Sequence, residues 1–332
     1  MRPLRWILLG LATLVALLAL LWGSLALWID GPASRPLAGA LAGAYGVAGV
    51  AALSRLRPVW RGALAVAVLV GGIIAWEQAI PARNDRNWMP DVAELPSATV
   101  VGDRLTLRNV RDFVYHSSDS DFTAHWDTRT YDLSQLRGVD LFFSFWGPTD
   151  IAHTIMSWDF GAGGHLAISI ETRKEVGESY SAVRGFFRQY ELYYVVADER
   201  DVIGVRAQQR GEHLWLYRLV LPPATARALL LDYLEEVNRL AVKPRWYNAF
   251  THNCTTSIRQ HVMHVTAVAP WSWQLLLNGH LEELLYRRGA FGDALPFAEL
   301  RQQSEITERA RDAGDAADFS ARIRAAAPTP AP

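Results

Sequence analysis

Cysteine is the residue that this sequence of 332 residues almost lacks, since Cys254 is its single example. One cysteine excludes an internal disulfide, and the absence of a CxxC pair excludes the usual cysteine-based zinc site. Net charge is also nearly absent, at −1, so the chain has no overall basic field of the kind that nucleic-acid binding requires. We therefore expect neither a disulfide scaffold nor nucleic acid as a partner.

Charge is also missing from three long runs in the first eighty residues. The run at 4–29 carries one charged residue, at its edge, and it exceeds the roughly 20 apolar residues that cross a bilayer. Runs rich in small residues follow at 37–53 and at 62–80, the latter uncharged up to residue 76 with Glu77 near its end, and small residues favour close helix packing in lipid. The first run is too long for a signal peptide and is followed by no small-x-small cleavage site. The sequence predicts a three-helix membrane anchor at 1–80.

Arginines in the short loops set the expected orientation of this anchor. Arg2 and Arg5 precede the first helix, and three arginines lie between the second and third helices, whereas the first loop carries one. Because positive charge favours the cytoplasmic side, three crossings place residue 81 and its successors outside. We expect a bacterial inner-membrane protein whose C-terminal domain is periplasmic.

The remaining sequence predicts a linker at 81–100, a catalytic domain at 101–300 and a disordered tail at 301–332. Strand patterns come first and helical patterns follow, which indicates an α+β fold with an antiparallel sheet packed on helices. The expected strands are 104–115, 125–133, 138–147, 165–171, 190–197 and 213–219. The expected helices are 222–241, 254–265 and 272–289.

The cysteine lies in the stretch THNCTTSIRQH, where a polar turn leads into a helical pattern. Asn253 is a good helix N-cap, so Cys254 would be the first helical residue, followed by Thr255. The free N–H groups and partial positive charge of a helix N-terminus lower a thiol pKa. The same N–H groups can hold an oxyanion. We therefore predict Cys254 as a nucleophile, with Asn253 and Thr255 as cap and oxyanion residues, against the alternative of a buried structural cysteine.

A thiolate enzyme needs a base, and His165 is the leading candidate. It follows a glycine-rich segment and begins an alternating strand pattern. His153 stays open as an alternative. The other nearby histidines do not suit, because they precede the cap or lie two to three turns along the same helix. They are His252, His261 and His264.

Three charged residues complete the predicted site. Asp198 would orient the imidazole if the strands at 165–171 and 190–198 pair antiparallel, whereas Glu171 lies six strand residues from His165 and cannot reach it. Glu171 and Arg173 belong to a charged run that we assign to substrate binding, Arg173 toward a lipid phosphate or peptide carboxylate. A solvated face is the alternative for this run. The acidic run at 198–201 lacks His and Cys, so we expect no metal and no cofactor.

The blocks around His165 and Cys254 resemble a known family. Residues 110–285, with HLAISIETRKEVGESYSAVRGFFRQYELYYVVADERDVIGVR and YNAFTHNCTTSI, are similar to the exported N-terminal domain of Lnb-type bacterial lipoprotein N-acyltransferases. The order His before Cys resembles the permuted papain-like group related to NlpC/P60. The resemblance implies a cysteine–histidine thiol enzyme whose acyltransferase members move a fatty acyl chain from a phospholipid to a lipoprotein amine.

Three readings of function follow from these patterns. The leading one is a membrane-anchored periplasmic thiol acyltransferase or hydrolase that works through a Cys254 thioester, with membrane phospholipid or lipoprotein as substrate. The second is a cell-wall peptidase or amidase of NlpC/P60 type. The third is a non-catalytic envelope assembly or binding module, which predicts a thiol of ordinary reactivity.

Overall fold

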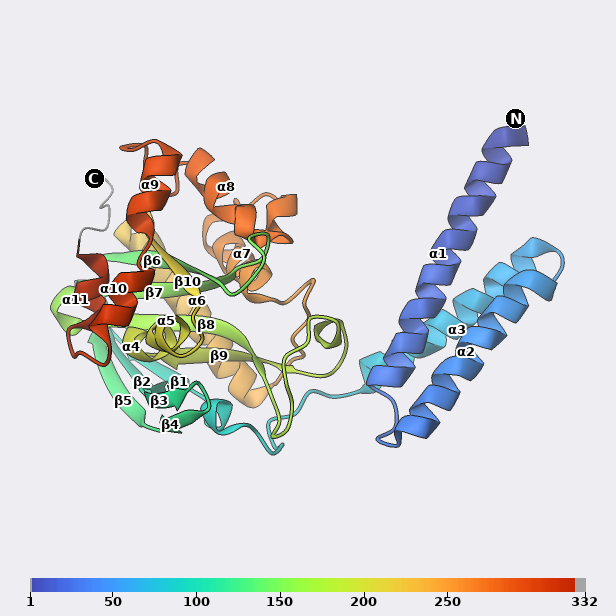
Figure 1. Cartoon of the computed structure of the whole chain (residues 1–332), viewed down its shortest axis with the longest axis horizontal. Helices are drawn as coiled ribbons and strands as arrows, with labels where there is room; N and C mark the ends of the chain where they lie inside the picture. The colour runs from blue at the N-terminus through green and yellow to red at the C-terminus, as the bar shows by residue number, and fades with distance from the viewer. Residues whose placement is uncertain (1, 326–332) are drawn as a thin grey trace. The chain divides into compact units, whose positions relative to one another are not determined.

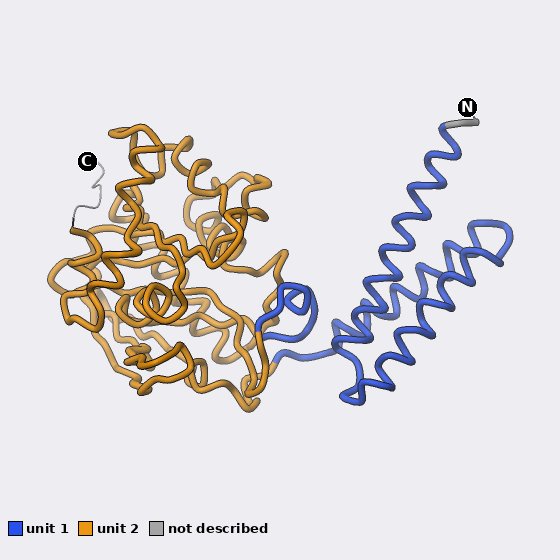
Figure 2. Tube along the Cα trace, in the orientation of Figure 1, with its two compact units in different colours: residues 1–82, 180–190 blue, residues 83–179, 191–332 orange. Residues whose placement is uncertain are grey.

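The computed structural model describes residues 2–325, and the chain divides into two compact units (Figure 2). Unit 1 is Met1–Ala82 together with Tyr180–Tyr190. Unit 2 is Arg83–Ser179 together with Glu191–Pro332. The predicted tail residues 326–332 lie outside the described part of the chain.

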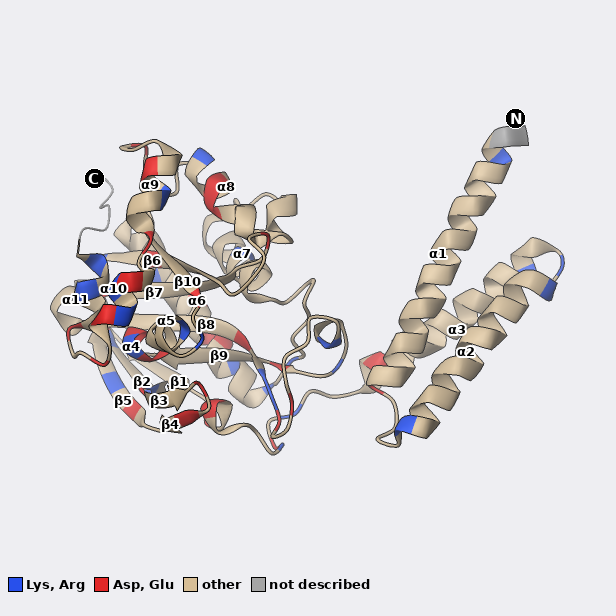
Figure 3. Ribbon diagram, viewed as in Figure 1, with Lys and Arg blue, Asp and Glu red and all other residues tan. Residues whose placement is uncertain are grey.

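Unit 1 contains helices α1 (Arg2–Ile29), α2 (Arg35–Arg55) and α3 (Val59–Ala79), shown in Figure 1. Within the described residues, these are the three helices long and apolar enough to cross a membrane. Figure 3 shows their charged residues gathered near the helix ends, with the middle of each helix free of them. Most of their large apolar side chains are exposed, as expected for surfaces that face lipid. The predicted three-helix anchor is confirmed in number and position.

A segment distant in sequence completes unit 1. Phe187 is buried in the same apolar cluster as Leu20 and Tyr45 of the helices. The carboxylate of Asp30, just after α1, accepts hydrogen bonds from the Arg188 backbone N–H and the Gln189 side-chain amide, at 3.1 and 2.8 Å. The predicted continuous domain at 101–300 is therefore interrupted, because the connection between two of its strands packs with the anchor helices.

Unit 2 is built on a twisted sheet of eight strands within the described residues (Figure 1). The order is β1-β2-β9-β8-β7-β6-β10, with β5 pairing β2. All pairs are antiparallel except β2 with β9, so the predicted antiparallel sheet is largely confirmed and is mixed at that one junction. The strands are β1 Ser97–Val101, β2 Arg104–Arg111, β5 Trp126–Asp132, β6 Gly138–Phe145, β7 His153–Asp159, β8 His165–Arg173, β9 Glu191–Ala197 and β10 His213–Arg218. A separate hairpin joins β3 Val114–Ser118 and β4 Asp121–Thr123.

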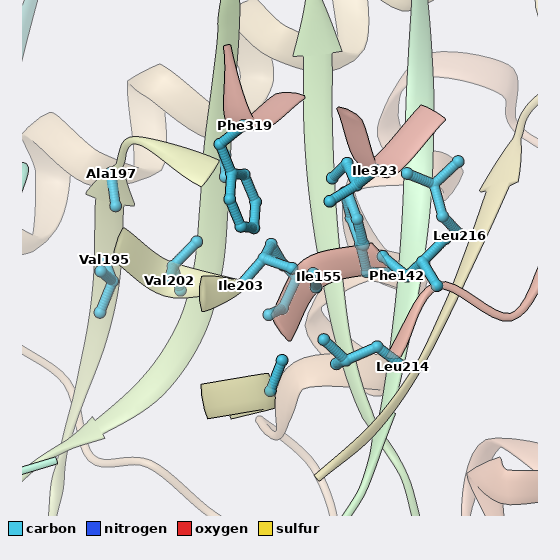
Figure 4. Close-up of a cluster of buried hydrophobic side chains, with 14 of the residues drawn as sticks. Phe142, Ile155, Val195, Ala197, Val202, Ile203, Leu214, Leu216, Phe319 and Ile323 are labelled. Carbon is cyan, nitrogen blue, oxygen red and sulfur yellow. The ribbon is translucent and has the colours of Figure 1, made fainter. Parts of the chain in front are cut away.

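Helices cover both faces of the sheet. Successive strand residues point to opposite sides, and both sides carry apolar side chains that are buried. On β7, Ile155 joins an apolar cluster with Val202, Phe319 and Ile323 on one face (Figure 4). The opposite face of the sheet carries Trp158, whose indole N–H donates to a backbone carbonyl of α6. The first face is covered by α4 Glu199–Val202, α5 Gly204–Gln208, α10 Thr307–Ala313 and α11 Phe319–Arg324. The second is covered by α6 Pro223–Val242 and α7 Cys254–Thr266, while α8 Leu281–Arg287 and α9 Phe297–Ser304 complete the unit.

Two segments differ from the sequence-based expectation near the C-terminus. The predicted helix at 272–289 is broken into the turns Trp273–Leu275 and Asn278–His280 followed by α8. The tail predicted to be disordered from 301 is folded as α9, α10 and α11 up to Arg324. Its alanine- and aspartate-rich composition hid two apolar residues four apart, Phe319 and Ile323, which are almost fully buried.

Arg324 ties this tail to the sheet. Its guanidinium contacts the buried carboxylates of Asp140 and Glu199 at 2.7 and 2.6 Å. Two buried carboxylates need such a partner, because an unpaired buried charge is strongly destabilising. The tail is therefore part of the core of unit 2.

The predicted linker at 81–100 also packs into unit 2. Trp88 and Val92 are buried in the core cluster. Arg173 holds this segment by donating to the backbone carbonyls of Val92 and Ala93, at 2.9 and 2.7 Å, and its guanidinium lies over the Trp88 ring. Arg173 is 2% exposed. The assignment of Arg173 to substrate binding is therefore wrong, since its donors are used inside the fold.

Candidate active site

Local signals place the cysteine as the sequence predicts. Helix α7 begins at Cys254, and Asn253 caps it by accepting the Thr256 backbone N–H at 2.8 Å. The Thr256 hydroxyl in turn accepts the Asn253 backbone N–H at 3.0 Å, which completes a capping box. The predicted cap role of Asn253 is confirmed, and it fixes the sulfur at the first helical position.

The imidazole beside the thiol is that of His153, the first residue of β7. Thr154 and His153 both hydrogen bond with Cys254. Cys254 and His153 are both buried, with 8% and 9% of their surface exposed. The sequence pattern left His153 open because β7 is covered on both faces and shows no clean alternation.

The predicted pairing of Cys254 with His165 is wrong. His165 lies opposite Asp159 in the register of β7 and β8, six residues along β7 from His153. At 3.3–3.4 Å per residue this separates the two histidines by roughly 20 Å. His165 instead approaches the Asp159 carboxylate, with Nε2 to Oδ1 at 3.8 Å. It therefore lies at the opposite end of the sheet from the cysteine.

Asp198 does not orient the imidazole beside Cys254 either. The strands β8 and β9 pair antiparallel as expected, so Asp198 follows β9 at the His165 end. Its carboxylate caps α4 through the Arg200 backbone N–H and binds Arg129 at 2.5 Å. The predicted antiparallel pairing of β8 and β9 is confirmed, but it brings Asp198 to the end of the strands that carries His165 and not to His153.

Glu171 is the carboxylate that approaches His153. Its Oε1 lies 3.1 Å from His153 Nε2, and Ser169 Oγ lies 2.7 Å from both groups. With Nε2 occupied in this way, Nδ1 is the ring nitrogen left for the thiol. As expected, Glu171 lies too far along β8 to reach His165. The pairing of β7 with β8 brings Glu171 to His153 instead. Its predicted role in substrate binding gives way to this contact.

Arg206 supports Glu171 from the far side. Its guanidinium binds Glu171 at 2.7 Å and Glu212 at 3.1 Å, and the Glu212 carboxylate also accepts the Ser144 hydroxyl. The Arg206 side chain is 5% exposed and that of Glu212 is 6% exposed, so this ion pair is shielded from water, whereas the Glu171 side chain is 27% exposed. A chain of polar groups, buried except at Glu171, thus runs from the thiol through the imidazole and Glu171 to Ser144. Nothing in the local sequence around residue 206 indicates this role.

The electrostatic effects of this chain favour a charged pair. Burial raises the pKa of the Cys254 thiol, but the charge of His153 and hydrogen bonds from His153 and Thr154 lower it to about 6. Burial lowers the pKa of His153, but the negative charge of Glu171 outweighs this and raises it to about 9. Burial raises the pKa of Glu171, yet His153 and Arg206 hold it well below its usual value. Between pH 6 and 9 the pair is therefore a thiolate and an imidazolium.

Asn278 joins the nucleophile to the base. Its side chain accepts the Ala152 backbone N–H at 2.8 Å and donates to the Ala152 carbonyl and to the Thr255 hydroxyl, the latter at 2.7 Å. Ala152 precedes His153 and Thr255 follows Cys254, so one buried amide holds both chain segments. The predicted cap or oxyanion residue Thr255 is thus fixed in place at the site. Residue 279, which follows Asn278, must be glycine, because a Cβ on Gly279 would lie 1.9 Å from the Thr149 carbonyl oxygen.

Replacing Asn278 by alanine will slow reactions at Cys254. The change leaves the backbone N–H and carbonyl of Ala152 without the partner they have here, at a cost of about 1–3 kcal/mol in the free energy of unfolding. A shift of about 1 Å between the two segments lowers an acylation rate by as much as 10²-fold. Stopped-flow acylation and thermal melts measure the two effects.

Asn238 provides the matched control. It makes the same two-bond contact with a backbone, accepting the Ala98 N–H and donating to the Ala98 carbonyl, each at 2.8 Å. That contact is exposed and joins α6 to β1, away from the cysteine. Asn238→Ala should leave the acylation rate unchanged. An equal loss of rate in both variants would contradict a positioning role for Asn278.

The fold and the site define a class of protein: a membrane protein with an α+β domain that carries a buried cysteine–histidine–carboxylate cluster. Residues 122–279 match the family model described as the Lnb N-terminal periplasmic domain. Both Cys254 and His153 lie inside this match, so the part of the chain that carries the cysteine and its neighbouring imidazole is similar to that family. No match was found among curated proteins or among solved structures.

Proposed function

We propose that this protein is an inner-membrane thiol enzyme whose periplasmic domain transfers or hydrolyses acyl groups through a thioester on Cys254. The observation that carries the proposal is the buried thiol at the start of α7, lowered in pKa to about 6 by His153. Perturbed pairs of this kind favour catalytic sites over structural ones. A structural cysteine needs no carboxylate-supported imidazole beside it.

The proposed first half-reaction forms the thioester. The Cys254 thiolate attacks an ester carbonyl, the new C–S bond forms, and the electron pair of the carbonyl moves onto oxygen. N–H groups at the start of α7 stabilise that oxyanion. The C–O bond to the leaving alcohol then breaks, and the His153 imidazolium gives its proton to the departing oxygen. His153 ends this step neutral, with Glu171 holding its orientation.

The second half-reaction releases the acyl group. An amine or a water molecule attacks the thioester carbonyl, and neutral His153 accepts its proton. The C–S bond breaks and Cys254 leaves as the thiolate, which restores the original ion pair. The product is an amide when an amine attacks and a carboxylic acid when water attacks. The charge state of the resting site is thus regenerated without any other group.

The membrane anchor favours a lipid as the acyl donor. The same chain carries three helices able to span a bilayer, so the enzyme works at a surface made of acyl esters. A membrane phospholipid is therefore the preferred donor, and the amine of a lipoprotein is the preferred acceptor. A cell-wall peptide would use the same Cys254 chemistry at an amide carbonyl, and the experiment below separates the two.

Intact mass spectrometry of the full-length protein tests the proposal. In lipid nanodiscs containing one phospholipid with a labelled acyl chain, we expect Cys254 to gain the mass of that chain. Cys254→Ala should gain nothing. Nanodiscs supplied with muropeptides serve as the second arm. A peptide adduct in place of the acyl adduct would assign peptidase chemistry, and no adduct together with a thiol of ordinary reactivity would leave a non-catalytic binding module.

A further inference from the structure

Three groups of ligand-type side chains converge in the described residues, and two of them are already neutralised. In each group the candidate ligand atoms lie within 4.8 Å of one another. In the group Asp140, His165 and Glu199, the Arg324 guanidinium lies between the two carboxylates, at 2.7 and 2.6 Å. An arginine in that position supplies the positive charge that a metal ion would bring.

The second group is Asp112, His125 and Asp127, and arginine satisfies it too. Arg129 binds both carboxylates, at 2.9 and 3.3 Å, and a second arginine binds Asp112. This group also offers one imidazole only, from a side chain that is 61% exposed. Neither of these two groups therefore calls for a cation.

The third group offers two imidazoles instead of one, and within the described residues its carboxylate is not neutralised by an arginine. Asp232 lies on α6, and His261 and His264 lie three residues apart on one face of α7. Both imidazoles direct Nδ1 at the same carboxylate oxygen, Asp232 Oδ2, at 2.5 and 3.2 Å. Among the residues that the structure describes, no arginine or lysine forms an ion pair with Asp232.

We propose that Asp232, His261 and His264 form a binding site for a divalent transition-metal ion of the zinc type, between α6 and α7. Two imidazole nitrogens and one carboxylate oxygen are the donors that zinc favours, whereas calcium and magnesium favour oxygen alone. Water would complete the coordination, because the His264 side chain is 62% exposed and leaves the site open. The site is separate from the proposed Cys254 chemistry.

The surroundings of His261 suit a metal ligand. Its other ring nitrogen, Nε2, lies 2.7 Å from the Tyr194 hydroxyl oxygen, and metal-bound histidines almost always donate from that second nitrogen. The Tyr233 ring stacks on the imidazole at a centroid distance of 3.9 Å. These contacts fix the ring with Nδ1 toward Asp232.

A metal ion here would join α6 to the second and third turns of α7, the helix that begins at Cys254. We expect it to stabilise unit 2 without entering the reaction, because metal bound only by the folded state raises thermal stability. The predicted effect is thus on melting temperature and not on thiol chemistry.

Cobalt and zinc titrations of the full-length protein test the site. The protein is purified in detergent without a polyhistidine tag and is treated with a chelator. We expect one equivalent of Co²⁺ to produce the visible absorption of a low-coordinate cobalt site, and Zn²⁺ to displace it and raise the melting temperature. His264→Ala and Asp232→Asn should each weaken binding at least tenfold; His264 is exposed, so its variant should fold.

His125→Ala is the matched control, because it removes the imidazole of another cluster and leaves α7 intact. It should bind Co²⁺ as the wild type does. Absence of any cobalt spectrum in the wild type would overturn the proposal. So would unchanged affinity in His264→Ala, or a loss in His125→Ala that matches the loss in His264→Ala.

Discussion

Replacing His153 by asparagine moves the pH midpoint of Cys254 alkylation from about 6 to 9 or above. The thiol pKa of about 6 depends on the positive charge of His153, and burial alone raises it beyond the ordinary value of 9.0. The sign is clear: losing a nearby cation disfavours the thiolate, so the thiolate forms at higher pH. Iodoacetamide labelling of the full-length protein across pH 5–10 measures the shift.

The same substitution should reduce acyl transfer by about 10²–10⁴-fold, the usual contribution of a general acid–base group. The loss exceeds the loss in alkylation at pH 7, because a thiolate of higher pKa is more nucleophilic and partly compensates. Comparison of the two assays therefore separates thiol activation from proton transfer to the leaving group.

His165→Asn is the control for this prediction. His165 lies at the other end of β7 and β8, so its loss should leave the alkylation midpoint near 6. A midpoint that moves in His165→Asn and stays in His153→Asn would restore the pairing that the sequence suggested and contradict the site described above.

Replacing Phe319 by alanine will destabilise unit 2 by about 3–5 kcal/mol, the usual cost of removing a buried aromatic ring. Phe319 is 1% exposed and packs in the cluster that covers one face of the sheet (Figure 4). For a domain of this size the loss corresponds to a fall in melting temperature of about 6–20 °C. Thermal melts of the full-length protein in detergent measure it.

Arg322→Ala lies in the same helix and is the matched control. Its side chain is 52% exposed and pairs with Asp318, one turn away. Exposed pairs of this kind contribute about 0.3–0.5 kcal/mol, so its melting temperature should hardly change. If Phe319→Ala melted like Arg322→Ala, α11 would not belong to the core, and the tail would behave as its composition suggested.

The features that could be predicted from the sequence are those encoded within a few residues of chain. The anchor helices follow from long uncharged runs, and the start of α7 follows from Asn253 and Thr256 around Cys254. Strands β2, β5, β6, β8, β9 and β10 follow from apolar alternation or from short apolar runs, whereas the sequence patterns predict neither β1 nor β7. In each case the physical cause is local: transfer of a continuous run into lipid, or satisfaction of free N–H groups by a neighbouring side chain.

The folded tail marks the limit of composition as a guide. The last thirty residues are rich in alanine, aspartate and proline, and this composition predicts a disordered chain. Two side chains, Phe319 and Ile323, were enough to fold it once a sheet face was there to receive them. Burial depends on a partner surface, and that surface is assembled from strands more than a hundred residues upstream.

The sequence by itself determined that the chain is anchored by three apolar helices and that its one cysteine stands at a helix N-terminus. Only the tertiary structure decided which histidine meets it. That choice depends on the register of β7 against β8, which places Glu171 beside His153 and leaves His165 at the far end. Register is set by the packing of whole faces, so no local pattern around either histidine could reveal it.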